Sequence, residues 1–210
     1  GYSAGGGGCW RIAVRYPDRF AAMAPHVGYD LWGYLNVQNL GIWQRVGALT
    51  PYAGIASAIE KLRLLGADAR LSVDDNRIKP LHYGEVWDSL EPWLLSKRSE
   101  RWPRRVVYTT YGDIDGAYWV HGILPTRFGH AATVAATVVT NGEIVMQTEN
   151  VATFRLDLRG PIFTGSVNWR LSIDQAYATN IRANAVFEYS TDDAEARYDG
   201  LRKRSGFCGG

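Results

Sequence analysis

The pentapeptide Gly1-Tyr2-Ser3-Ala4-Gly5, at the start of the stretch GYSAGGGGCWRIAVR (residues 1–15), decides how the first half of this sequence folds. It matches the pattern G-x-S-x-G, in which a serine stands at a sharp turn between a strand and a helix. We expect Gly1 and Gly5 to flank this turn because side chains there would clash across it. A serine hydroxyl is a good nucleophile only when a base removes its proton, so a histidine must also be found.

Helical and extended patterns alternate behind the pentapeptide. In chain order they predict a short helix closed by Pro17, a buried strand over 20–28, a helical excursion over 29–41, a strand over 42–47, a helix over 51–67, a strand over 69–75 and an amphipathic helix over 83–98. Such alternation is typical of crossover units, and it indicates a mostly parallel sheet with flanking helices.

The pattern changes at Trp102-Pro103, after which apolar residues recur with period two. The segments concerned are RVVYTT, AYWVHGI, TVAATVVT, EIVMQT, TFRLDL, NWRLSI and AVFEYS. Asn141-Gly142 between two β-branched runs predicts a type I′ hairpin. We therefore expect one domain over 1–103, an antiparallel β-sandwich-like domain over 104–195, and a Gly-rich basic connector over 196–210 that leads to a further segment.

Composition excludes several classes of partner. The 210 residues are 46% hydrophobic and carry a net charge of +2, from 23 basic and 21 acidic residues spread along the chain. No basic stripe suggests nucleic acid, and no apolar run reaches the roughly 20 residues that span a bilayer. Cys9 and Cys208 stand at opposite ends of the chain, without the spacing of metal ligands or of a disulfide framework.

Three stretches carry a resemblance to a known family: residues 1–28, 42–71 and 81–98. Together they resemble the C-terminal half of an α/β-hydrolase, most closely the prolyl oligopeptidase and dienelactone-hydrolase-like group of bacterial serine hydrolases. The resemblance implies a partial α/β-hydrolase sheet and acyl transfer from a small-molecule ester or a peptide to water, with no metal or organic cofactor. The β segment and the GLRKRSG tail bear a weaker likeness to regions that follow such domains.

The resemblance also implies roles for individual residues. Ser3 is the expected nucleophile, and the backbone N–H of Ala4 is the expected donor to the oxyanion. Chain order in this fold is Ser, acid, His, which selects His82 as the general base. His26 is expected to end the strand after the pentapeptide, and the remaining histidines fall in the β region.

The acid departs from the family pattern. The position three residues after Gly47, where an Asp is expected, holds Thr50, which cannot carry a negative charge. Asp30 could reach His82 from the neighbouring strand end. Asp74 or Asp75 is close to His82 in sequence, although such a pair more often forms a solvated turn. Losing only the acid lowers turnover by about 10⁴-fold in a serine triad.

A second expectation concerns the other oxyanion donor. In the family it comes from a loop N-terminal to the pentapeptide, so the resemblance implies that the N-terminal half of the same chain is a required partner. A parallel sheet without those strands has an unpaired edge, and we expect association or poor solubility from it.

Other interpretations stay open. One is a hydrolase-fold binding module that has lost turnover, which Thr50 favours, and another is a β domain that docks glycan or protein. Aromatic residues could line such sites, but a core position is the commoner reason for an aromatic side chain. We expect core positions for Trp32, Tyr34 and Trp43 in the first part of the chain and for Tyr118, Trp119 and Trp169 in the second.

Overall fold

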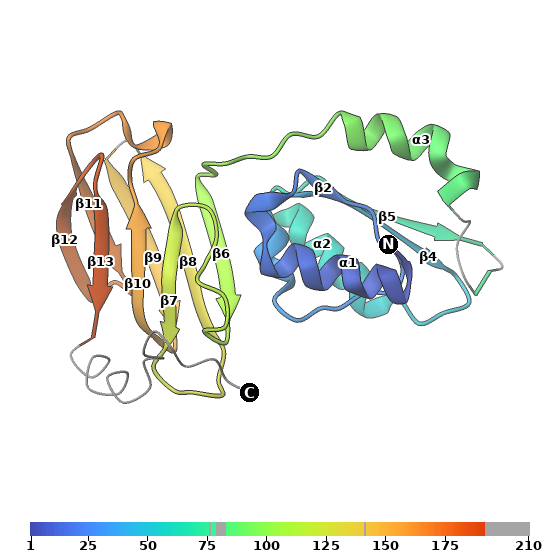
Figure 1. The fold of residues 1–210 in the computed structure, drawn as a ribbon, viewed down its shortest axis with the longest axis horizontal. Coiled ribbons are helices and arrows are strands. Elements are labelled where there is room, and N and C mark those ends of the chain that lie inside the picture. Colours follow the sequence, from blue (N-terminus) through green and yellow to red (C-terminus); the bar gives the residue numbers. More distant parts are fainter. Residues whose placement is uncertain (76, 79–82, 141, 192–210) are drawn as a thin grey trace, which may run out of the picture. The chain divides into compact units, whose positions relative to one another are not determined.

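The structure is a computed structural model that describes residues 1–75, 77–78, 83–140 and 142–191. It divides into two compact units, Gly1–Thr109 and Thr110–Gly210. Each unit is described separately, and its elements can be followed in Figure 1. The roles expected from the sequence, a partial hydrolase domain, a β domain and a connector, stay predictions.

The first unit contains a parallel sheet of short strands. Its members are β1 (Tyr2–Ser3), β2 (Ala22–Met23), β3 (His26–Val27), β4 (Gly41–Gly47) and β5 (Ala69–Asp74). Strand β1 pairs with β3, both β3 and β2 pair with β4 on one side, and β5 pairs with β4 on the other. The single strand expected over 20–28 is therefore wrong in detail, because β2 and β3 are separated at Pro25, which has no N–H to donate.

Helices cover both faces of this sheet. They are α1 (Ala4–Arg15), α2 (Ala53–Leu64) and α3 (Tyr83–Leu95), with short 3-10 turns at Pro17–Arg19 and Tyr34–Val37. Helices α1 and α2 bury Trp10, Ile55 and Ile59 in one apolar cluster with Ile42 and Val46 of β4.

Helix α3 packs on the opposite face. Its Leu90 and Trp93 form a second apolar cluster with Ala24 and Trp43. Residues 42 and 43 are neighbours on β4, so their side chains point to opposite faces, and the two clusters must lie on either side of the sheet. The mostly parallel sheet with flanking helices is thus present as expected.

The remaining strands form two further sheets. They are β6 (Arg105–Thr110), β7 (Val120–Pro125), β8 (Ala132–Thr140), β9 (Glu143–Glu149), β10 (Val151–Asp157), β11 (Asn168–Ile173), β12 (Tyr177–Arg182) and β13 (Val186–Ser190). One sheet has the order β12-β11-β9-β8-β6 and the other β13-β10-β7.

These sheets differ from the expected antiparallel arrangement in two ways. The pairs β7/β10, β10/β13, β8/β9 and β11/β12 are antiparallel, whereas β9 and β11 run parallel. Strand β12 was not expected at all. The hairpin β8/β9 is confirmed by the pairing of Thr140 with Glu143, while Asn141, on which its turn type depends, lies outside the described residues.

The core of the second unit contains the aromatic residues that could have formed a sugar platform. Trp119 and Trp169 are fully buried, and each makes an edge-to-face contact with Phe163 at 5.3 Å and 5.4 Å between ring centroids. Their assignment to the core is confirmed, whereas Tyr118 is only half-buried.

Candidate active site

Ser3 stands at the junction between a strand and a helix. It is the last residue of β1, and α1 begins at Ala4. Its backbone has φ 55° and ψ −120°, a conformation that residues with a side chain rarely adopt, and its hydroxyl makes no capping bond to the helix. This strained strand-to-helix turn is the geometry that the G-x-S-x-G pattern predicts.

Glycines allow the backbone to close around this turn. A Cβ on Gly1 would lie 1.8 Å from the carbonyl oxygen of Gly5, and one on Gly28 would lie 2.2 Å from that of Ser3. A Cβ on Gly6 would lie 2.6 Å from the carbonyl oxygen of His26. The expected steric role is therefore confirmed for Gly1 but wrong for Gly5, around whose Cβ position there is open space.

The turn lies at the carboxyl edge of the sheet. Because β1, β3, β4 and β5 are parallel, their last residues, Ser3, Val27, Gly47 and Asp74, share one edge. Loops at this edge form the binding crevice of open α/β sheets. His82 lies outside the described residues. In the sequence it falls between the end of β5 and the start of α3. Its role as the general base for Ser3 therefore stays a prediction.

Ala4 is the first residue of α1 and its side chain is exposed. The first N–H groups of a helix have no carbonyl partner within the helix, and they carry the positive end of its dipole. An N–H in this place, directly after the serine, can donate to an oxygen that becomes negative when Ser3 attacks a carbonyl.

Both expected acid positions have other partners. The Thr50 hydroxyl donates to the carbonyl oxygen of Gly47 at 2.8 Å, which fixes it in the turn after β4. Asp30 Oδ2 accepts a hydrogen bond from Arg11 Nε of α1 at 2.8 Å, and its Oδ1 accepts one from the Trp32 N–H at 3.1 Å. The Arg11 side chain lowers the pKa of Asp30, so the carboxyl is an anion at neutral pH. Arg11 thus competes for the carboxylate that the sequence offers to His82.

Asp74 is not the solvated turn residue that its sequence context suggests. Its Oδ1 forms an ion pair with Arg45 Nη2 at 2.7 Å, and the two side chains are only 12% and 11% exposed. Asp75, the next residue, is exposed. Sequence reasoning overlooked Arg45, although a charged residue inside the buried strand IWQRVG was an available signal.

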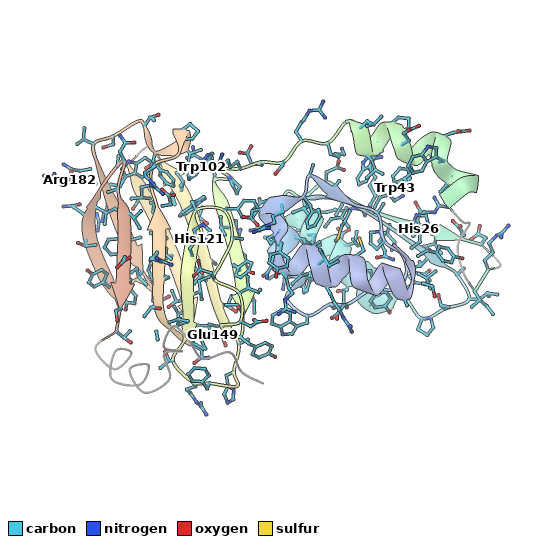
Figure 2. The ribbon with its side chains drawn as sticks, viewed as in Figure 1. His26, Trp43, Trp102, His121, Glu149 and Arg182 are labelled. Carbon is cyan, nitrogen blue, oxygen red and sulfur yellow. The ribbon has the colours of Figure 1, made fainter. Side chains whose placement is uncertain are left out.

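His26 is fully buried in β3. Its ring lies 6.3 Å from that of Tyr2 in β1, and it pairs across the sheet with Arg45. Figure 2 labels His26 and Trp43, two of the side chains that lie on the α3 face of this sheet.

The aromatic residues of this unit do not behave alike. Trp43 packs edge-to-face on Trp93 with centroids 5.4 Å apart, and its Nε1 donates to the Ser72 hydroxyl. Tyr34 packs against the main core. Trp32 is 39% exposed, so its expected place in the core is wrong.

An apolar cavity of about 400 Å³ opens on the β1 side of the sheet. Cys9 and Ile12 of α1, Phe20 before β2, and Trp87 of α3 contribute to its walls. Burial raises the pKa of the Cys9 thiol, so this thiol is uncharged at neutral pH. Among the described residues, no group of three or more His, Cys, Asp or Glu side chains is placed to hold a metal ion, and no helix has the length and hydropathy to cross a membrane.

The chain was compared with protein families, curated proteins and solved structures. No protein-family profile matches the chain, and no curated protein matches it. A crystal structure of a thermostable esterase aligns over 46% of this chain and 30% of its own, with 21% sequence identity and a TM-score of 0.39. The aligned part therefore spans less than a third of the esterase's length.

Proposed function

We propose that Ser3 is the nucleophile of a hydrolase that transfers an acyl group from an ester or a peptide to water. The observation that carries the proposal is the strained backbone of Ser3 at the end of β1, directly before the first turn of α1. A serine that only began a helix would adopt ordinary extended backbone and cap the helix with its hydroxyl. Ser3 does neither.

The proposed reaction uses few groups of this chain. Ser3 Oγ attacks the carbonyl carbon while its proton passes to the imidazole of His82. The carbonyl oxygen becomes an oxyanion and accepts a hydrogen bond from the Ala4 N–H, a donor of a kind worth about 3 kcal/mol. The imidazolium then protonates the leaving alcohol or amine. Water attacks the acyl-serine in the same way, which releases the acid and restores Ser3.

A second oxyanion donor would complete this site. Among the described strands, β1 stands at the end of the order β1-β3-β4-β2. We propose that polypeptide placed beyond this edge, the N-terminal half expected from the resemblance, supplies the second N–H and covers the apolar cavity.

The proposed subgroup of serine hydrolases depends only on the sequence resemblance. On that resemblance we propose a prolyl oligopeptidase-like or dienelactone-hydrolase-like serine hydrolase, with the β part as an accessory domain. The substrate on this assignment is a small ester or a peptide.

Covalent labelling with a fluorophosphonate tests the proposal. Ser3 Oγ would displace fluoride and form a bond to phosphorus, which mass spectrometry detects on the peptide that contains residue 3. We expect no labelling of Ser3→Ala and at least a 100-fold slower reaction of His82→Ala, the size of a lost general base. Ser57→Ala is the matched control, because Ser57 is an exposed serine within α2, and it should label like the wild type.

A catalytically impaired binding module is the second candidate. The contacts of Thr50 and Asp30 favour it, because both expected acid positions bond to groups other than an imidazole. The absence of labelling at every pH between 6 and 9 would support this candidate and contradict the enzyme. Glycan binding by residues 104–210 alone would instead place the function in the β part.

A further inference from the structure

Two residues with an unusual backbone conformation lie side by side in the first unit. Among its described residues other than glycine, only Ser3, at φ 55°, and Val27, at φ 70°, have a positive φ. The two are paired in register on the parallel strands β1 and β3. A positive φ is rare for a β-branched residue such as valine, and strain of this kind persists only where the surrounding structure imposes it. The contacts of Val27 and its neighbours show what imposes it here.

Val27 is the centre of a γ-turn. The N–H of Gly28 donates to the carbonyl of His26 at 3.0 Å, a bond from one residue to the second residue before it. With a positive φ at its central residue, this is the rarer and more strained of the two forms of γ-turn. Such a turn bends the chain within three residues, so Gly28 leaves the line of β3.

The turn brings the backbone of Gly28 against the start of α1. A Cβ on Gly28 would lie 2.2 Å from the carbonyl oxygen of Ser3 and 2.7 Å from the nitrogen of Gly7. A Cβ on Gly6 would lie 2.6 Å from the carbonyl oxygen of His26 and 2.7 Å from that of Gly28. Neither Gly6 nor Gly28 has a left-handed φ, so glycine is required at both positions for close approach alone. The two backbones therefore meet with no side chain between them.

These contacts hold the backbone on both sides of the serine. Before it, the N–H of His26 donates to the carbonyl of Gly1 at 2.8 Å. After it, Gly28 lies against the Ser3 carbonyl and the first turn of α1. The same first turn carries the Ala4 N–H, the donor expected for the oxyanion.

We propose that the γ-turn at Val27, together with Gly6 and Gly28, positions Ser3 and the Ala4 N–H for the reaction. The turn holds the serine and the donor in one fixed geometry, so that the donor already points to where the oxyanion forms. The inference rests on the proposed function, in which Ser3 is the nucleophile. It adds that the end of β3, outside the G-x-S-x-G pentapeptide, is needed for the rate of acyl transfer.

Two substitutions in α1 test the contact with the turn. Gly6→Ala places a methyl group against the backbone of residues 26–28, whereas Gly8→Ala adds the same group with no atom within 4 Å. Both replace a helical glycine with alanine, so both raise helix propensity. A displacement of about 1 Å can slow an enzymatic reaction about 100-fold. We expect the rate constant for fluorophosphonate labelling at Ser3 to fall at least tenfold in Gly6→Ala and to stay within twofold of wild type in Gly8→Ala.

The labelling kinetics separate positioning from loss of fold. A protein in rapid exchange with its unfolded state loses labelling rate only in proportion to the unfolded fraction, which circular dichroism measures at the same temperature. A tenfold loss in a mostly folded Gly6→Ala protein therefore reports a displaced serine. The pH of half-maximal rate should be the same in Gly6→Ala and wild type, because the proton acceptor is unchanged. A shift of that pH would mean that the substitution acts on the general base, which contradicts the role proposed for the turn.

Substitutions at Val27 test the turn independently of any reaction. Glycine adopts a positive φ without strain and alanine does not, so Val27→Gly should melt about 5 °C above Val27→Ala. Val73 is the matched control, a half-buried valine of β5 without a positive φ, and there the glycine variant should melt below the alanine variant. A Val27→Ala protein as stable as Val27→Gly, or more stable, would contradict the strained turn on which the proposal rests.

A measurement on the wild type serves if Gly6→Ala does not fold. In urea below the unfolding transition, labelling at Ser3 should slow in step with the loss of hydrogen-exchange protection at the Gly28 amide, which is bonded to His26 within the turn. Labelling that keeps its full rate after the Gly28 amide has lost protection, or that slows while this amide is still protected, would refute the positioning role.

The outcomes distinguish the two proposals. If the wild type labels at Ser3 and a folded Gly6→Ala protein labels at the same rate, the positioning role is refuted and the proposed function stands. If Gly8→Ala slows as much as Gly6→Ala, the contact with the turn is not the cause, and the positioning role is again refuted. If the wild type does not label, the proposed function fails, and the positioning role fails with it whatever the melting temperatures of the Val27 variants.

Discussion

Replacing Ser3 with glycine should make this protein more stable while removing its proposed nucleophile. Ser3 has φ 55° and ψ −120°, a region of backbone conformation that glycine occupies without strain and other residues do not. Ser3→Ala and Ser3→Gly both delete the hydroxyl. They differ only in the Cβ atom, so comparing them isolates the strain of the turn.

The size of the difference follows from two opposing terms. A side-chain-bearing residue in this region costs about 1–3 kcal/mol. Glycine in turn loses about 0.5–1 kcal/mol more than alanine through its freedom in the unfolded chain. With about 2 kcal/mol of strain relieved, Ser3→Gly should be more stable than Ser3→Ala by about 1 kcal/mol. For a unit of about 100 residues this raises the melting temperature by about 5 °C.

Thermal unfolding followed by calorimetry measures the difference, with a control at Ser57 in α2. Ser57→Gly should be less stable than Ser57→Ala by about 1 kcal/mol, because glycine is unfavourable inside a helix. The sign of the Gly–Ala difference should therefore reverse between the two positions. If Ser3→Gly is equal to or less stable than Ser3→Ala, the strain at residue 3 is no more than the glycine cost of about 0.5–1 kcal/mol, and the argument for a strained elbow is refuted.

Three further predictions follow from the contacts of the first unit. Arg45→Met should lower the free energy of unfolding in urea by about 3–5 kcal/mol, since it removes the cation that pairs with the mostly buried Asp74 carboxylate, and adding Asp74→Leu should recover most of the loss. Asp30→Asn should lower the free energy of unfolding by only about 0.5 kcal/mol at pH 7, because solvent screens the ion pair between Asp30 and Arg11. Because the pKa of Asp30 is lowered in the folded state, this contribution is fully present above the unfolded pKa of about 3.9 and is lost as the pH falls through the folded pKa. The stability difference between wild type and Asp30→Asn should therefore shrink steadily as the pH is lowered below about 3.9. The reactivity of Cys9 can be followed in a variant in which Cys208 is replaced. Because burial raises the pKa of the Cys9 thiol, it should react with iodoacetamide at pH 8 several-fold more slowly in the native protein than in guanidinium chloride. Equal rates in the two conditions would contradict the raised pKa.

The sequence predicted the elements whose signals are local. The G-x-S-x-G pattern located the end of β1 and the start of α1, since a sharp turn requires glycines close to the serine. Helix α2 (Ala53–Leu64) was evident from apolar residues on one face. Strand β12 (Tyr177–Arg182) was missed because Ile181 is its only buried residue, so the alternation that marks a strand is almost absent.

Features that depend on register were not accessible from the sequence. The ion pair between Arg45 and Asp74 joins residues that are 29 positions apart, and it exists because Gly47 pairs with Asp74. The contact of Asp30 with Arg11 likewise depends on how the loop after β3 lies on α1. For the same reason the sequence predicts a solvated turn residue at Asp74, whereas its side chain is mostly buried.

A crystal structure of the phosphonylated protein would test the central claim most directly. We predict a bond from phosphorus to Ser3 Oγ, a phosphonyl oxygen about 2.7–3.1 Å from the Ala4 nitrogen, and the His82 imidazole within hydrogen-bonding distance of the serine oxygen. A phosphonyl group on another residue, or an imidazole on the opposite face of the sheet from Ser3, would contradict the assignment of this chain as a serine hydrolase.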